Sequence, residues 1–477
     1  MKAPFSAYLN SLRDGLRELI ALLRRDYDYV SVLATDSRGL AVRITQRARS
    51  VGSETMTTER GIVVRVCRDG QYSEYALNTF DPADPARAAE EICAAFARQA
   101  ALLRAAGTGV FRTPALDDEP LTLFVEKETQ ELPETADVRA LVEELTALSD
   151  RGMTLGKDLI DCMLRAESTH VCKMFLTEKR DLRQSYVYSE GSAVAVANRE
   201  GRTQIGYESV SGLGGPELFR GLGEKLEKAV EQAEELLDAE RIEPGEYEII
   251  TSPEVSGLIA HEAFGHGVEM DMFVKNRALG RDYIGRRVGS ELVTMHEGAL
   301  CAENVTSYAF DDEGTLAGDV VEIEEGILRT GICDALSALR LGVKPTGNGK
   351  RENFEHKVYT RMTNTIFDSG EDTLEDMIAS VEHGYLLEGM ESGMEDPKHW
   401  GIQCIIKAGR EIRNGRFTGK LVAPIIMTGY VPDLLGNISM RSRDREVFGA
   451  GGCGKGYKEW VKVSDGGPYL KTKARLG

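Results

Sequence analysis

The residues best suited to chemistry in this chain are those of HEAFGH, residues 261 to 266, together with one distant cysteine, Cys453. His261 and His266 offer two imidazoles, Glu262 offers a carboxylate beside the first, and Cys453 offers a thiolate. Catalytic zinc sites combine three protein ligands with an open position for water and a nearby base. These four side chains therefore favour a metal site that activates water, and a metallopeptidase is the leading hypothesis.

The spacing of the two histidines differs from that of the common zinc motif HExxH. Histidines four residues apart lie about 40° apart around a helix, whereas histidines five apart lie about 140° apart. A straight α-helix would therefore not direct His261 and His266 at one metal. Gly265 and Gly267 flank His266, so the last turn can loosen into a π-type bulge or end in a left-handed cap. Either change would bring His266 back toward His261.

A helix is expected to carry this motif. Ser252 is a suitable N-cap, Pro253 suits the first helical position, and an apolar stripe follows toward His261. The sequence predicts a helix over 253–265, and the Cys453 loop must meet it.

The glycine-rich run around Cys453 has a second interpretation. GAGGCGK matches the first seven positions of the phosphate-binding pattern GxxxxGK[ST], but Gly456 stands where a magnesium-binding hydroxyl is needed. The preceding SMRSRDREVF is also a poor core strand. Nucleotide binding is therefore disfavoured, whereas glycines would let the backbone approach a metal closely.

Five segments occur in an order that resembles a known family. They are HEAFGHGVEMD, YAFDDEGTLAG at 308–318, PTGNGKRENFEH at 345–356, RMTNT at 361–365 and GGCGKG at 451–456. In these segments the chain resembles the TldD branch of the TldD/PmbA peptidase family from about residue 245 to its end. Before residue 240 the resemblance is weaker and rests on ERGIVVRVCRDGQYSEYALN and GYESVSGLGG.

The resemblance implies a zinc-dependent peptidase whose metal is held by His261, His266 and Cys453, with Glu262 as general base. Zinc would lower the pKa of its water to about 7 and polarise the scissile carbonyl, while Glu262 carries the proton to the leaving amine. Imidazole and thiolate ligands also accept other metals, and zinc is the first expectation.

The family also implies a partner and a substrate class. Its members assemble as homodimers, or as heterodimers with a TldE (PmbA) subunit that lacks the metal motif, and they enclose the active site. We therefore expect a homodimer or a heterodimer with a TldE/PmbA-like subunit, acting on short or unfolded peptides. The alternative is a noncatalytic, TldE-like or peptide-binding subunit, which the complete set of His261, Glu262, His266 and Cys453 disfavours.

Several other polar residues have roles that the sequence leaves open. Glu269 and Asp271 could orient a ligand imidazole, or could lie on a solvated loop. His356 ends the tract 345–356, which could supply substrate contacts or form a structural turn. The remaining histidines each stand alone and are expected to be surface or core residues: His170, His296, His383 and His399.

Composition narrows the class of protein. A net charge of −19 over 477 residues disfavours binding to nucleic acid or to an anionic membrane. Eight cysteines without a CxxC pair indicate free thiols in a reducing compartment. No apolar run reaches the length of a signal peptide or a membrane span, so a soluble, cytoplasmic protein is expected.

The pattern of elements predicts an α+β fold with two domains. Residues 1–240 are expected to form an N-terminal domain of α/β type, and residues 241–477 a mainly antiparallel sheet or barrel that carries the metal helix. The chain breaks at RIEPGE, 241–246. Expected helices cover 9–23, 86–106, 136–150, 216–240, 332–341, 373–384 and 429–437. Expected strands cover 29–34, 40–45 and 61–66, separated by glycine-containing turns, and 186–201, 247–251, 290–298, 319–331, 402–419 and 421–429.

Overall fold

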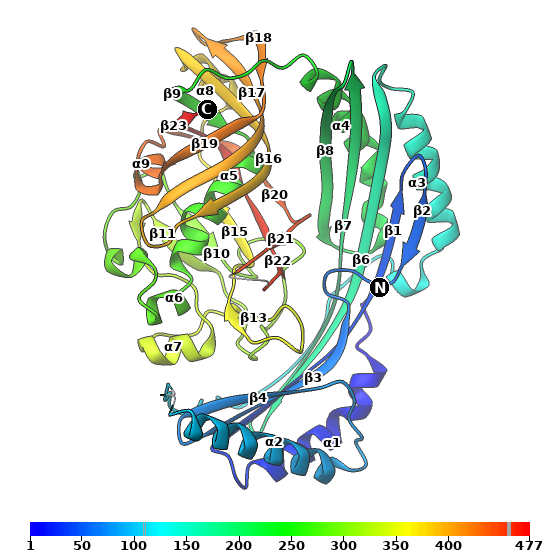
Figure 1. Cartoon of the computed structure of the whole chain (residues 1–477), viewed down its shortest axis with the longest axis vertical. Coiled ribbons are helices and arrows are strands. Elements are labelled where there is room, and N and C mark those ends of the chain that lie inside the picture. The colour runs from blue at the N-terminus through cyan, green and yellow to red at the C-terminus, as the bar shows by residue number, and fades with distance from the viewer. Residues whose placement is uncertain (108, 110, 456–458) are drawn as a thin grey trace.

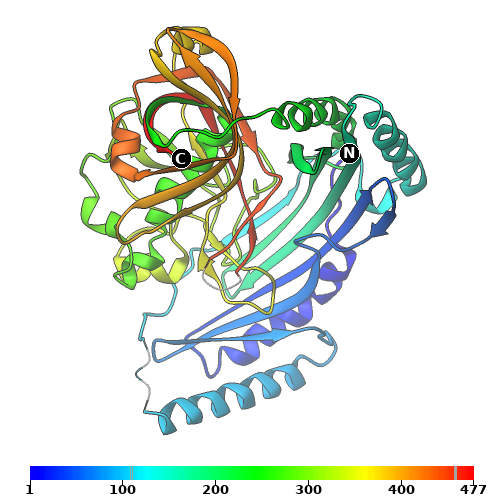
Figure 2. The same ribbon diagram turned by 45° about the horizontal axis from the view of Figure 1, so that its top comes forward.

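The fold consists of two large sheets with helices on them. The structure is a computed structural model that describes residues 1–107, 109, 111–455 and 459–477. Strands β1 to β8 form an eight-stranded sheet, the N-terminal sheet, and most of the later strands form an eleven-stranded sheet (Figures 1 and 2). The predicted α+β class is confirmed. The division into domains 1–240 and 241–477 stays a prediction about folding units.

The N-terminal sheet has the order β4-β3-β1-β6-β7-β5, with β2 on β1 and β8 on β7. Its strands are β1 (Tyr29–Ile44), β2 (Arg49–Gly52), β3 (Glu59–Arg68), β4 (Gln71–Leu77), β5 (Leu121–Glu126), β6 (Leu159–Thr177), β7 (Arg180–Arg199) and β8 (Arg202–Leu213). Helices α1 (Ala7–Leu23) and α2 (Pro85–Ala105) cover one half, and α3 (Val138–Gly152) and α4 (Leu222–Leu236) cover the other (Figure 1). The long strands β1 and β6 contribute to both apolar clusters.

The predicted turn between 29–34 and 40–45 is wrong. Strand β1 runs straight through Gly39, which pairs with Thr169 of β6. A Cβ on Gly39 would lie 2.5 Å from Thr58 Oγ1 and 2.6 Å from the Ser53 carbonyl oxygen. This glycine therefore permits a close approach of the 53–58 segment instead of turning the chain.

The eleven-stranded sheet closes on itself. Strand β23 pairs with both β19 and β9, and the order β19-β17-β16-β9 joins them, so five strands form a closed barrel. Strands β15, β10, β11 and β12 extend from β23, and most pairings are antiparallel, as predicted. The strands are β9 (Gly245–Thr251), β10 (Met295–Glu297), β11 (Val320–Glu324), β12 (Ile327–Leu328), β15 (Asn364–Phe367), β16 (His383–Glu395), β17 (Gly401–Arg413), β18 (Arg416–Val422), β19 (Ile425–Tyr430), β20 (Met440–Phe448) and β23 (Ser464–Leu476).

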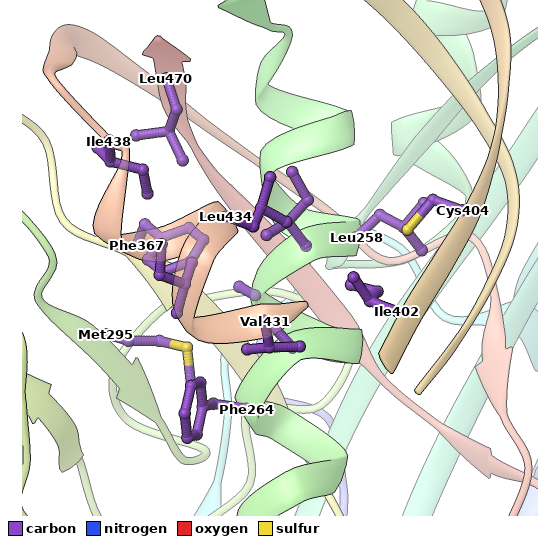
Figure 3. Close-up of a cluster of buried hydrophobic side chains, with 14 of the residues drawn as sticks. Leu258, Phe264, Met295, Phe367, Ile402, Cys404, Val431, Leu434, Ile438 and Leu470 are labelled. Atoms are coloured by element: carbon purple, nitrogen blue, oxygen red, sulfur yellow. The ribbon is translucent and has the colours of Figure 1, made fainter. Parts of the chain in front are cut away.

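Helix α5 (Pro253–Ala260) lies at the centre of the largest apolar core. Leu258 and Phe264 pack among side chains of β10, β15, β17, β23 and helix α9 (Val431–Gly436), as Figure 3 shows. The other helices are α6 (Asp271–Val274), α7 (Ala335–Leu341) and α8 (Leu374–Ala379). Two small hairpins complete the set, β13 (Gly349–Lys350) with β14 (Tyr359–Thr360) and β21 (Gly452–Cys453) with β22 (Val461–Lys462).

Several local predictions can be compared with these bounds. The hairpin turn at Asn414 and Gly415 is confirmed, since both have positive φ, 49° and 75°. The helix predicted over 373–384 is too long, because β16 begins at His383. Segment 439–448, which precedes the glycine-rich run, does form a strand, β20, but most of its residues are not buried. Gly456, the other residue that argued against nucleotide binding, lies outside the described residues. None of the described helices is long and apolar enough to cross a bilayer.

Candidate metal centre

The helix that carries the histidines begins and ends as its sequence predicts. Ser252 caps it by accepting a hydrogen bond from the Val255 amide at 3.4 Å, and Pro253 follows at the first helical position. After Ala260 the chain forms one π turn over 261–265, in which the His266 amide donates to the His261 carbonyl. Of the two predicted alternatives, the π-type bulge is therefore the one observed. The extra residue of HExxxH is absorbed in a wider turn.

The π turn brings the two imidazoles together. Their ring centroids are 5.2 Å apart at an angle of 88°. Cys453, on hairpin β21–β22, places Sγ 3.2 Å from His266 Nε2. One donor atom from each of these three residues lies within 4.8 Å of the others.

These distances suit one metal ion. Zinc bonds of about 2.0 Å to nitrogen and about 2.3 Å to sulfur place tetrahedral ligands roughly 3.3–3.8 Å apart. Two imidazoles and a thiolate are a donor set that zinc accepts, so the residues fit a zinc ion after small movements.

The electrostatics of the three groups are coupled. Burial lowers the pKa of His261, but the Cys453 thiolate outweighs burial and raises it to about 9. Burial raises the pKa of the Cys453 thiol, but His261 and His266 together bring it well below its usual value. The three groups thus stabilise one another's charged forms, and a bound metal dication would take the place of the imidazolium protons.

Glu269 and Asp271 share Lys455 but differ in their other partners. Glu269 Oε2 lies 3.2 Å from His266 Nδ1 and 3.1 Å from Lys455 Nζ. Asp271 pairs with Lys455, at 2.7 Å, and with Lys275, at 3.1 Å. Glu269 is thus the one of the two that contacts a candidate ligand, in the arrangement in which carboxylates orient metal-binding imidazoles.

Arg361 also supports the candidate metal site, and the sequence analysis did not predict this. Its guanidinium is fully buried, donates to the Cys453 carbonyl at 2.9 Å and lies 3.4 Å from Glu269. One arginine therefore contacts both the cysteine loop and the carboxylate behind His266. The only signal in the sequence was its place in the motif RMTNT.

A cavity of about 1260 Å³ opens beside the three donors. Its walls include Glu262, residues 390–395 of β16, and Ile205 and Tyr207 of β8, so it lies between the N-terminal sheet and the barrel. Glu262 is 8% exposed. A Cβ on Gly393 would lie 2.5 Å from Glu262 Cγ, so strand β16 passes directly against this carboxylate.

The tract 345–356 joins the two sheets. Arg351 forms two hydrogen bonds with Glu74 of β4, at 2.6 and 3.0 Å. His356 Nδ1 lies 3.2 Å from Glu352 and 3.1 Å from Glu459. These three side chains are partly exposed, and the contacts of the imidazole with the two carboxylates explain why they lie together. A structural role for this tract is therefore better supported than a substrate contact.

The isolated histidines lie outside the site. Each faces a carboxylate: His170 faces Glu134, His296 faces Asp319, His383 faces Glu411, and His399 faces Asp396. These contacts agree with the structural roles expected for them.

Comparison with known proteins places the chain in a family. Residues 244–474 match the model of the PmbA/TldA metallopeptidase C-terminal domain. A metalloprotease of Synechocystis is 28% identical over 471 residues, which cover 98% of each chain. The chain belongs to the TldD/PmbA family.

Two further members of the family extend this comparison. A zinc metalloprotease TldD homologue of Saccharolobus solfataricus is 32% identical over 232 residues, 48% of this chain and about half, 51%, of that relative. The crystal structure of TldE from Thermococcus kodakarensis superposes with a TM-score of 0.76 at 17% identity, covering 97% of this chain and 100% of that one. This likeness shows that the two chains share a fold.

Proposed function

We propose that this chain is a zinc-dependent peptidase that hydrolyses short or unfolded peptides. The observation that carries the proposal is the meeting of His261, His266 and Cys453 at the wall of a large cavity, with Glu262 beside them. The metalloprotease names of its relatives support it.

His261, His266 and Cys453 would hold the zinc ion. When bound, zinc supplies Lewis acidity, which polarises a carbonyl and makes a water molecule more acidic. Glu269 and Arg361 hold the surrounding groups in place, since they contact His266 and the Cys453 carbonyl.

Glu262 is the proposed general base. It is nearly buried in the cavity wall, next to His261, where a substrate carbonyl and a water molecule would meet. A carboxylate in this position takes a proton from the attacking water and gives it to the departing amine. Such proton transfer contributes about 10²–10⁴-fold to a rate.

The cavity favours an extended peptide as substrate. Strand β16 pairs with β9 only over residues 384–387, whereas its pairing with β17 continues to residue 395. Among the described strands none pairs with the other edge of residues 391–395, and this segment lines the cavity beside Glu262. An unpaired edge of this kind binds an extended chain through main-chain hydrogen bonds. A folded protein could not present its backbone there.

We also propose that the chain works as a dimer, with itself or with a TldE/PmbA-like subunit. The shared fold with the Thermococcus kodakarensis TldE supports this proposal. Light scattering of the purified chain, alone and mixed with such a subunit, would distinguish the two forms.

The deciding experiment compares zinc-loaded, chelator-treated and zinc-restored protein on a panel of unfolded peptides and on a folded protein. Cleavage of the peptides alone, lost with zinc and regained with it, is the expected result. Glu262→Gln should keep its zinc and lose about 10²–10⁴-fold in rate. Glu134→Gln removes a carboxylate that faces His170, outside the cavity, so it is the matched control and should keep most of the activity.

Two outcomes would count against this function. Cleavage that survives Glu262→Gln would remove Glu262 from the mechanism. A zinc-loaded wild type that cleaves no peptide would favour the alternative of a noncatalytic or peptide-binding subunit.

A further inference from the structure

The second ring nitrogen of His261 faces the Asp465 carboxylate, one oxygen of which is unpaired among the described residues. His261 Nδ1 lies 3.9 Å from Asp465 Oδ2, and their side chains are 7% and 10% exposed. Within the described structure, both His261 Nδ1 and Asp465 Oδ1 are buried without a hydrogen-bond partner. A separation of 3.9 Å is too long for a hydrogen bond, and leaving buried polar atoms unpaired is destabilising. A small rotation of the imidazole would bring Nδ1 within hydrogen-bond distance of Asp465 Oδ2, whereas Oδ1 faces Gly257.

Asp465 is placed by close packing between helix α5 and strand β23. A Cβ on Gly257 would lie 2.7 Å from Asp465 Oδ1 and 2.6 Å from the Gly466 amide nitrogen. Gly257 precedes His261 by four residues, so the two lie on the same face of the helix. The absence of a side chain at Gly257 therefore lets the Asp465 carboxylate reach the helix one turn before the histidine that it faces.

The two candidate ligand histidines have matching surroundings. His266 directs Nε2 at Cys453 and Nδ1 at Glu269, and His261 directs Nδ1 at Asp465. The titratable groups near Asp465 are His261, Glu262, Cys453 and Glu254, and of these only His261 can carry a positive charge. Glu269, by contrast, also contacts Lys455 and Arg361. Asp465 therefore depends on His261 for its pairing.

We propose that Asp465 is a positioning residue that accepts a hydrogen bond from His261 Nδ1–H and thereby fixes Nε2 as the metal donor. This inference rests on the proposed function, because it requires a metal at His261. Ligand histidines commonly donate their other N–H to a carboxylate, which fixes the tautomer and the ring orientation.

The test compares zinc affinity in wild type, Asp465→Asn and Asp465→Ala by competition with a chelator. Loss of such a partner weakens metal binding by about 10–100-fold, and we expect that range for both variants. The matched control is Glu134→Gln, which removes a carboxylate that lies 2.7 Å from Nδ1 of His170, outside the site. That variant should bind zinc as wild type does.

Two spectroscopic measurements separate positioning from a general structural role. In cobalt-loaded protein, the thiolate-to-cobalt band should persist in both Asp465 variants, because Cys453 stays bound, while the ligand-field bands shift. In zinc-loaded wild type labelled with ¹⁵N-histidine, His261 should show the Nδ1–H tautomer. This second measurement needs no variant, and an Nε2–H tautomer would overturn the proposal even if both substitutions prevent folding.

Unchanged zinc affinity in both variants, an equal loss in Glu134→Gln, or an Nε2–H tautomer at His261 would each overturn the role of Asp465. In those cases the wild type still binds zinc, and the proposed function stands. A wild type that takes up no zinc would overturn both.

Discussion

Gly265, in the π turn between the two histidines, is held against Met362, and this contact gives a quantitative prediction. Its backbone angles, φ −57° and ψ −59°, are ordinary for a helix, so alanine is conformationally allowed. The alanine side chain does not fit, however, because its Cβ would lie 2.2 Å from Met362 Sδ, whereas ordinary contact begins at 3.4 Å. The two groups must separate by 1.2 Å (3.4 minus 2.2).

The expected change in the free energy of unfolding of Gly265→Ala follows from two opposing effects. Overpacking a core costs about 1–3 kcal/mol, and replacing glycine by alanine within a helix recovers about 1 kcal/mol. Gly265→Ala should therefore lower the free energy of unfolding by up to about 2 kcal/mol. Met362 is fully buried, so Met362→Ala alone should cost about 2–5 kcal/mol. In the double variant the truncated Met362 makes room, and the cost should fall short of the sum by about 1–3 kcal/mol.

Denaturant unfolding of the apo protein measures these three free energies, and chelator competition measures zinc affinity in the same variants. We expect Gly265→Ala to weaken zinc binding and the double variant to recover part of it, because the displaced turn lies between His261 and His266. Gly436→Ala is the control, since this glycine of α9 has no atom within 4 Å of its Cβ position. Additive free energies, or a stabilised Gly265→Ala with unchanged zinc affinity, would refute the reasoning.

Three further predictions concern the site and one distant histidine. His266→Ala and Cys453→Ser should each lose zinc, measured by elemental analysis, together with peptide cleavage; full zinc content in either would remove that residue from the ligand set. Glu269→Gln leaves the buried Arg361 without its carboxylate partner, while Lys455 keeps Asp271, and should lower the free energy of unfolding by about 1–3 kcal/mol; a change below 1 kcal/mol in denaturant unfolding would contradict this. Hydrogen bonds to Asp368 and then Asp319 raise the pKa of His296 to about 9, above its unfolded value near 6.5. This stabilisation is full below pH 6.5 and is lost as pH rises through 9, so the stability difference between wild type and His296→Asn should shrink over that range in denaturant unfolding.

The local part of the site could be predicted because it depends on short-range rules. The capping serine, the proline at the first helical position and the glycines around His266 all act within one turn of their own positions. They were sufficient to predict the helix and to limit its last turn to a π-type bulge or a left-handed cap, of which the structure has the π turn. The amphipathic helix α1 was predictable for the same reason, since its spacing of leucines alone defines the buried face.

Long-range placement was less accessible. Gly39 was taken for a turn because glycine commonly marks one, but its neighbours in the structure come from residues 53–58 and from β6. Strand β6, with 19 residues, was not predicted. Its central residues are buried in a continuous run, so the alternation that reveals a half-buried strand is absent. Whether a glycine bends a chain or admits a neighbour depends on that neighbour, and sequence pattern alone does not supply it.

The same limit explains why Asp465 and Arg361 escaped the sequence analysis. Each is separated from His261 or His266 by about a hundred residues or more, and neither belongs to a short pattern that implies a metal. They reach the site because β15 and β23 pair in parallel, with Thr365 opposite Asp465, and because α5 packs on β23 through Gly257. Arg361 then reaches the cysteine loop from the segment just before β15. The barrel therefore does more than support the helix. Strand β23 and the segment before β15 supply the groups that hold the histidines and the cysteine in position. Substitutions in β23 that leave HExxxH untouched should for this reason weaken metal binding as much as some substitutions within the motif.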